Sequence, residues 1–226
     1  MAISLEILSD PICPWCYIGK TRLERALEAR PNHPLYPAFW RPFQLNPDMP
    51  KEGMDRDSYL EAKFGGKEGA RQVYGRIEAA ALQDGLEVRF DLIRKTPNTV
   101  DAHRVIRWAA AAGAAAQNTL VAALFKRYFE QGADLSDHDL LLDVAQEAGL
   151  ERETIARLLR SETDARTVQG EDAAARAAGA NGVPTFIVHG KFVVPGAQDT
   201  ALWIRVIDEL TESLAAPDGA APPAAG

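Results

Sequence analysis

The chain contains two cysteines, which lie three positions apart as Cys13-Pro14-Trp15-Cys16. Two thiols at this spacing can form a reversible disulfide, or they can supply half of the ligands of a tetrahedral zinc site. Zinc would need two further cysteine or histidine ligands, and the four histidines are scattered singly along the chain. The sequence therefore favours dithiol chemistry and predicts no metal centre.

The elements around this pair predict where the thiols lie. Residues 3–8 alternate apolar and polar side chains, which indicates a β-strand, and Ser9-Asp10-Pro11 ends it. A helix is expected over residues 14–29, followed by a second strand over 36–43. These three elements form a βαβ unit with the cysteines at the first strand-to-helix turn.

A thiol at the start of a helix is close to unsatisfied backbone N–H groups and to the positive end of the helix dipole, and both favour the thiolate. We expect Cys13 to be the exposed member, which exchanges with a substrate disulfide, and Cys16 to resolve the mixed disulfide from one turn further in. Pro14 suits the first helical position. Trp15 is expected to shield the pair or to offer a flat apolar contact to a client.

Most of the remaining chain is helical in pattern. Helices are expected near residues 55–64, 67–83, 98–112, 115–131, 137–148, 151–160 and 162–178. Two of them are expected to begin with capping boxes, formed by Ser136 with Asp139 and by Ser161 with Asp164.

The β pattern returns near the end of the chain. Strands are expected over residues 183–188 and 191–194, joined by a tight His189-Gly190 turn, and a last helix over 198–214. The order βαβ, helices, ββα predicts an α/β thioredoxin-like fold with a large inserted α-helical domain. The expected parts are a thioredoxin-like domain over 1–45 and 180–214, a helical domain over 46–179, and a disordered tail over 215–226, which is rich in proline, glycine and alanine.

Four segments also carry a family resemblance. The chain is similar to the FrnE-like branch of the DsbA family of thiol–disulfide oxidoreductases. The matching segments are Asp10-Pro11-Ile12-Cys13-Pro14-Trp15-Cys16-Tyr17-Ile18-Gly19-Lys20, Pro97-Asn98-Thr99-Val100-Asp101-Ala102-His103-Arg104, Gly182-Val183-Pro184-Thr185-Phe186 and Gly196-Ala197-Gln198. The resemblance extends over nearly the whole chain.

The resemblance implies roles for three further residues. It implies a cis proline at Pro184 opposite the cysteines, with Val183 and Pro184 forming an edge to which an extended client peptide binds. It also places Glu6 beneath the cysteines as a candidate proton relay, although the following loop is one residue longer than in the family. Apart from the resemblance, His103 lies one helical turn from both Val100 and Ile106, at the edge of an apolar face, and is a second candidate, as structural support or as a group near the thiolate.

The predicted function is dithiol–disulfide exchange with cysteine-containing or unfolded protein clients. Glutathione or another thiol is the expected redox partner, and the direction (oxidase, reductase or isomerase) stays open. One alternative is a glutathione-dependent isomerase or transferase of the hydroxychromene-carboxylate or kappa-class type, which resembles this chain but carries serine in place of Cys13. Another is a holdase that grips unfolded chains and is switched by redox state.

Composition excludes other classes. A formal net charge of −7 argues against a surface that follows phosphates, so no nucleic-acid partner is expected. No apolar run is long enough for a membrane span, and the first residues lack a basic region followed by an apolar one, so a cytoplasmic protein is expected. No glycine-rich phosphate loop follows a strand, and no cofactor is expected beyond the cysteine pair.

Overall fold

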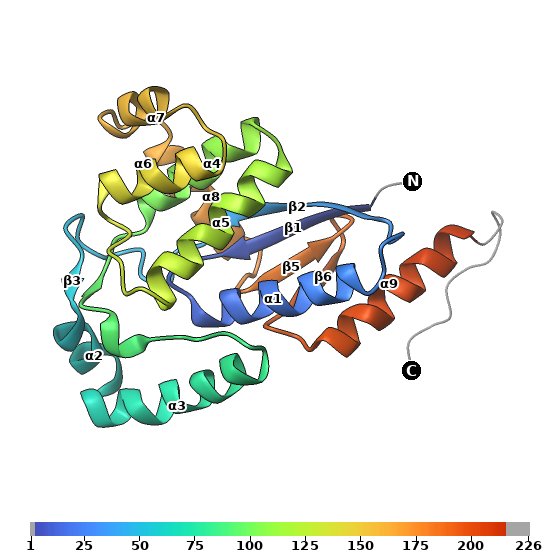
Figure 1. Ribbon diagram of the computed structural model, residues 1–226, viewed down its shortest axis with the longest axis horizontal. Helices are drawn as coiled ribbons and strands as arrows, with labels where there is room; N and C mark the ends of the chain where they lie inside the picture. The colour runs from blue at the N-terminus through green and yellow to red at the C-terminus, as the bar shows by residue number, and fades with distance from the viewer. Residues whose placement is uncertain (1–2, 216–226) are drawn as a thin grey trace.

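A four-stranded sheet forms the centre of the protein (Figure 1). The computed structural model describes residues 3–215, except for the side chains of residues 36 and 37. The strands are β1 (Ile3–Ser9), β2 (Leu35–Pro42), β5 (Thr185–Val188) and β6 (Phe192–Pro195), in the order β2-β1-β5-β6. β2 runs parallel to β1, while β5 is antiparallel to β1 and to β6.

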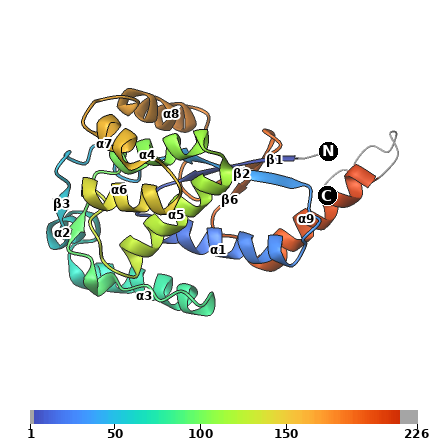
Figure 2. The same ribbon diagram turned by 45° about the horizontal axis from the view of Figure 1, so that its top comes forward.

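One face of this sheet is covered by α1 (Pro14–Glu28) and α9 (Thr200–Ala215), which lie side by side in both views (Figures 1 and 2). Successive side chains of a strand point to opposite faces, so Leu5 and Ile7 of β1 are buried together on this side. Trp203 of α9 packs edge-on against Phe186 of β5, with ring centroids 4.8 Å apart. Because α1 packs along α9, the helix that begins at the cysteines is held in this layer on the sheet.

A helical insertion separates β2 from β5 and lies beside the β2 edge of the sheet. Helices α4, α5 and α8 contact β2 directly. The inserted elements are β3 (Met54–Asp55), α2 (Arg56–Phe64), α3 (Lys67–Gln83), a 3-10 turn (Phe90–Leu92), β4 (Lys95–Thr96), α4 (Val100–Ala111), α5 (Ala114–Phe129), α6 (His138–Glu147), α7 (Arg152–Leu159) and α8 (Ala165–Ala177). This arrangement confirms the predicted thioredoxin-like fold with a helical insertion.

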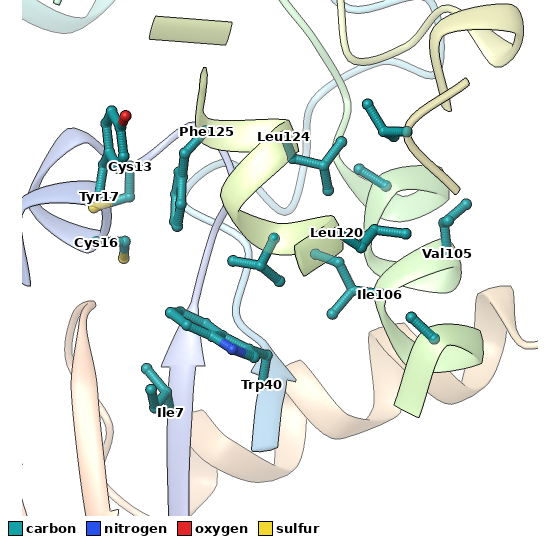
Figure 3. Close-up of a cluster of buried hydrophobic side chains, with 14 of the residues drawn as sticks. Ile7, Cys13, Cys16, Tyr17, Trp40, Val105, Ile106, Leu120, Leu124 and Phe125 are labelled. Atoms are coloured by element: carbon teal, nitrogen blue, oxygen red, sulfur yellow. The ribbon is translucent and has the colours of Figure 1, made fainter. Parts of the chain in front are cut away.

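One hydrophobic cluster runs through both parts of the molecule (Figure 3). It joins Ile7 of the sheet to Val105 of α4 and to Leu120 and Leu124 of α5, with Trp40 of β2 between them. The two cysteines belong to the same cluster. The insertion and the thioredoxin part therefore share one core.

Two predicted capping boxes are wrong. The N-cap of α6 is Asp137, whose carboxylate accepts from the Asp139 amide, and the Ser136 hydroxyl bonds to Asp134 instead. The N-cap of α8 is Asp164 and not the predicted Ser161, which lies three residues before it. An aspartate side chain caps α6, whereas no side chain caps α8, because the Asp164 carboxylate accepts from Trp108 Nε1 instead.

The structure differs from the predicted elements at one short ladder in the insertion and at the end of the last helix. The short β3–β4 ladder was not predicted, because a two-residue strand carries no alternation signal. α9 continues to Ala215, and the remaining predicted tail, residues 216–226, lies outside the described residues. Within residues 3–215, no helix combines the length and the apolar character that crossing a bilayer requires.

Candidate active site

Cys13 is the N-cap of α1. Its backbone is extended (φ −91°, ψ 112°), and Pro14 begins the first turn, where a missing N–H costs nothing. The Cys13 carbonyl accepts from the amides of Cys16 at 3.0 Å and Tyr17 at 3.3 Å. The cysteine side chains therefore lie on neighbouring positions of one tight turn, as the sequence predicted.

Both cysteines are reduced and buried. Cys13 is 3% exposed and Cys16 0%, whereas Trp15 between them is 37% exposed. The prediction that Cys13 would be the exposed member is wrong, because the segment before β5 folds over it. The Cys13 thiol donates to the Val183 carbonyl at 3.6 Å.

The environment of Cys16 opposes its ionisation. Burial raises the pKa of the Cys16 thiol well above its ordinary value, and the adjacent Cys13 acts in the same direction. The Ser9 hydroxyl and the Asp10 backbone amide counteract this shift in pKa, because they stabilise the thiolate. Cys16 therefore needs a proton acceptor before it can act as a nucleophile.

The Val183–Pro184 peptide bond is cis, and Pro184 packs directly on α1. A Cβ added at Gly19 would lie 3.0 Å from Pro184 Cγ and 3.4 Å from Ala197 Cα. Such a distance is shorter than an ordinary van der Waals contact. Glycine at position 19 therefore lets the segment that covers Cys13 approach the helix closely.

Gly19→Ala is expected to change the reactivity of the Cys13 thiol toward a small disulfide reagent several-fold, because the added methyl group displaces Pro184 and with it the neighbouring Val183 carbonyl that contacts Cys13. Gly75→Ala in α3 is the matched control, since no atom lies within 4 Å of its added Cβ. We expect the control to keep the wild-type rate, because it gains only helix propensity. Equal rates in the two variants would contradict the role of this close approach.

Comparison with known proteins identifies the family. Residues 4–204 match the DSBA-like thioredoxin domain. The chain belongs to this family. YwbO of Bacillus subtilis (strain 168) is 26% identical over 212 residues, which are 92% of this chain and 98% of YwbO.

Two solved structures are similar to this chain over most of its length. A probable DsbA oxidoreductase from Streptomyces coelicolor is 29% identical, with a TM-score of 0.80 over 98% of this chain and 100% of that chain. The cytosolic disulfide reductase DsbM from Pseudomonas aeruginosa, in its structure with GSH, is 20% identical, with a TM-score of 0.60 over 94% of this chain and 97% of that chain. At that identity, the likeness to DsbM shows the fold alone.

In this DSBA-like chain, Asp10 holds the loop before the cysteines. Its carboxylate accepts from the amides of Ile12 at 3.2 Å and Leu45 at 2.7 Å, and its carbonyl accepts from the Cys13 amide at 2.9 Å. Asp10 therefore links the active-site turn to the start of the insertion. Burial raises its pKa to about 7, although these bonds lower it.

His103 of α4 lies beside Asp10, with Nε2 3.9 Å from Oδ1. Burial lowers the pKa of His103 to about 4, while the negative charge of Asp172 acts in the opposite direction. The imidazole is therefore neutral near pH 7, and its contact with Asp10 is not an ion pair. The structure brings His103 into the neighbourhood of the cysteine loop.

The buried state of His103 predicts a dependence of stability on pH. Between about pH 6.5 and pH 4 the unfolded chain binds a proton at His103 and the native state does not, so stability falls as the pH falls. His103→Gln removes this contribution. The difference in free energy of unfolding between wild type and variant is expected to shrink by roughly 3 kcal/mol across this window. Urea denaturation at a series of pH values measures it, and a constant difference would contradict a buried neutral imidazole.

Glu6 lies apart from this group. Its carboxylate bonds to Arg41 Nε of β2 at 2.9 Å, and by strand alternation it leaves the sheet on the face opposite Leu5 and Ile7. The structure gives it no contact with Cys16. The sequence assigned no site role to Ser9 or Asp10. Both were used to end the strand, and Asp10 also begins a segment of the family resemblance. An acidic residue three positions before the first cysteine was the available signal.

The described residues 3–215 include no group of three or more cysteine, histidine or acidic side chains arranged to hold a metal ion.

Proposed function

We propose that this chain is a thiol–disulfide oxidoreductase that exchanges disulfides with protein clients through Cys13 and Cys16. The observation that carries the proposal is the position of Cys13, which stands at a helix start with its sulfur 3.6 Å from the Val183 carbonyl. Cys16 lies on the same turn and is more deeply buried. Membership of the DSBA-like family supports this chemistry.

The proposed reduction of a client has two balanced steps. The Cys13 thiolate attacks one sulfur of the client disulfide, forming a Cys13–client bond while the other client sulfur leaves as a thiolate. Cys16 then loses its proton and attacks the Cys13 sulfur, forming the Cys13–Cys16 disulfide and releasing the second client thiolate. The client gains two electrons and the enzyme loses two, so the reverse sequence oxidises a client dithiol.

The client is proposed to lie along Val183 and Pro184. An apolar hollow of about 670 Å³ adjoins these residues and continues between the end of α8 and the β5–β6 hairpin. Trp15, between the two cysteines in the chain, offers an exposed aromatic surface. A hollow of this size accommodates several side chains of an extended peptide.

Glutathione is proposed as the redox partner, and the cytoplasm as the compartment. The fold shared with DsbM, whose structure is described as that of a cytosolic disulfide reductase with GSH, supports both. In a reducing compartment a dithiol of this kind works catalytically rather than as a structural crosslink. We also propose that the chain belongs to the FrnE-like branch of the family. It is proposed to need no cofactor other than the cysteine pair.

A client-reduction assay separates this proposal from its alternatives. The full chain with excess glutathione is expected to reduce the disulfides of insulin and to have no activity on a hydroxychromene carboxylate. Isomerisation of that carboxylate without insulin reduction would favour the glutathione-dependent isomerase. Protection of a cysteine-free client from aggregation, without any reduction of insulin, would favour the holdase.

A further inference from the structure

Arg22 of α1 joins three parts of the chain that are distant in the sequence. Its Nε donates to Asp84 Oδ2 at 2.6 Å, and its Nη1 donates to the Ala197 carbonyl at 2.8 Å. Asp84 is the C-cap of α3, whereas Ala197 lies in the loop between β6 and α9. The side chains of Arg22 and Asp84 are 17% and 10% exposed, so solvent screens this ion pair only in part.

The loop that Arg22 holds contacts the segment that covers Cys13. The Gly196 amide, directly before the carbonyl that Arg22 binds, donates to the Pro184 carbonyl at 2.8 Å. Pro184 follows Val183, whose own carbonyl accepts from the Cys13 thiol at 3.6 Å. A continuous path of bonds therefore leads from the Arg22 guanidinium to the first cysteine.

The insertion supports the same loop from the other side. α3 lies beside α1 (Figures 1 and 2), and Ala197 packs against an apolar cluster formed by Ile18 of α1 with Ile77 and Ala81 of α3. This cluster is much smaller than the main core, so apolar packing alone holds the loop weakly. The guanidinium adds directed bonds, because its donors form a rigid fork that can bind a carboxylate and a carbonyl together.

We propose that Arg22 is a positioning residue for disulfide exchange, and that it holds the Val183–Pro184 segment in place beside Cys13 through the loop after β6. The inference rests on the proposed function, because it concerns the edge to which a client binds. Without this bridge, the loop and the segment that it supports move away from α1. Cys13 then becomes more accessible to small reagents, whereas a client strand loses the fixed edge that it needs.

Arg25 provides a matched control on the same helix. Its Nη1 donates to Asp84 Oδ1 at 3.1 Å and its Nη2 to the Asp84 carbonyl at 2.7 Å. Within the part of the chain that the structure describes, Arg25 makes no hydrogen bond to the loop after β6. Arg22→Ala and Arg25→Ala therefore remove the same charge from α1 and one arginine each from Asp84, but only Arg22→Ala releases the Ala197 carbonyl.

Two measurements on the full chain are expected to change in opposite directions in Arg22→Ala. kcat/KM for insulin reduction should fall about fivefold or more, mainly through a higher KM, because the client edge is displaced. Alkylation of Cys13 by iodoacetamide, located by mass spectrometry, should become several-fold faster, because the cover of the thiol is looser. Arg25→Ala is expected to keep both rates within about twofold of wild type, since a half-exposed ion pair contributes little.

Arg22→Lys is a second variant that keeps the positive charge but replaces the rigid fork by a single nitrogen. It is expected to show the same two opposite changes in milder form, and it decides the test if Arg22→Ala does not fold. Equal rates in the Arg22 variants and Arg25→Ala would overturn the positioning role. Slower insulin reduction without faster alkylation would also overturn it.

The two readouts separate this inference from the proposed function. If the wild type reduces insulin through both cysteines, and Arg22→Ala matches Arg25→Ala in both rates, only the positioning role fails. If the wild type does not reduce insulin, but alkylation is faster in Arg22→Ala than in Arg25→Ala, the positioning role stands and the assignment of protein clients fails.

Discussion

Cys16→Ala is expected to trap clients on the protein, whereas Cys13→Ala is expected to leave them untouched. Cys13 is 3% exposed and lies next to the Val183 carbonyl, whereas Cys16 is 0% exposed, so Cys13 is the thiol nearer to solvent. Without Cys16 the first step still occurs, and the mixed disulfide has no internal nucleophile to resolve it. Steady-state insulin reduction should fall by roughly a thousandfold or more in both variants.

Mass spectrometry under non-reducing conditions distinguishes the two variants. Cys16→Ala incubated with a disulfide client should carry one client molecule, which is released by a reducing agent. Cys13→Ala should carry none. If Cys13→Ala formed the adduct instead, the roles of the two cysteines would have to be exchanged.

Phe125→Ala is expected to lower the free energy of unfolding by about 3–5 kcal/mol, the usual cost of removing a buried phenylalanine. Phe125 of α5 is 0% exposed and stacks on Tyr17 of α1 with ring centroids 5.3 Å apart (Figure 3). It also meets Trp40 of β2 edge-on at 6.2 Å. The variant therefore loosens the contact between the active-site helix and the insertion as well as leaving a cavity.

Phe192→Ala is the matched control for this prediction. Phe192 in β6 is 62% exposed, so its removal should cost less than about 1 kcal/mol. Urea denaturation of both variants measures the difference. Similar losses at the two positions would contradict the view that α5 stabilises α1 through a packed aromatic stack.

The elements of this fold could be predicted from sequence because their signals are local. The predicted turn at His189-Gly190 has positive φ at both residues, 56° and 66°, as the central residues of a type I′ turn require, and the Lys191 amide closes this turn by donating to the Val188 carbonyl. The predicted last helix over 198–214 differs from α9 by two residues at its start and one at its end. Capping depends on which of several neighbouring polar side chains reaches the free amides, so Asp137 displaced the predicted Ser136.

The surroundings of the thiols could be predicted only in part. The position of Cys13 at the start of a helix could be predicted, because Pro14 directly follows it and proline favours the first helical position. The burial of Cys13 depends on Val183, which is 170 positions away in the chain. The approach of His103 to Asp10 likewise depends on how α4 packs against the sheet, and single-sequence periodicity carries no such information.

The continuous core has a consequence for redesign of this protein. Because Trp40, Phe125 and the cysteines belong to one packed cluster, the insertion is a fixed wall of the active site and not an exchangeable module. A chimera that takes its insertion from a relative would therefore need the matching residues of β2 and α1 as well. Specificity is more readily altered at the rim of the site, where side chains such as Trp15 meet solvent and can vary without disturbing their neighbours.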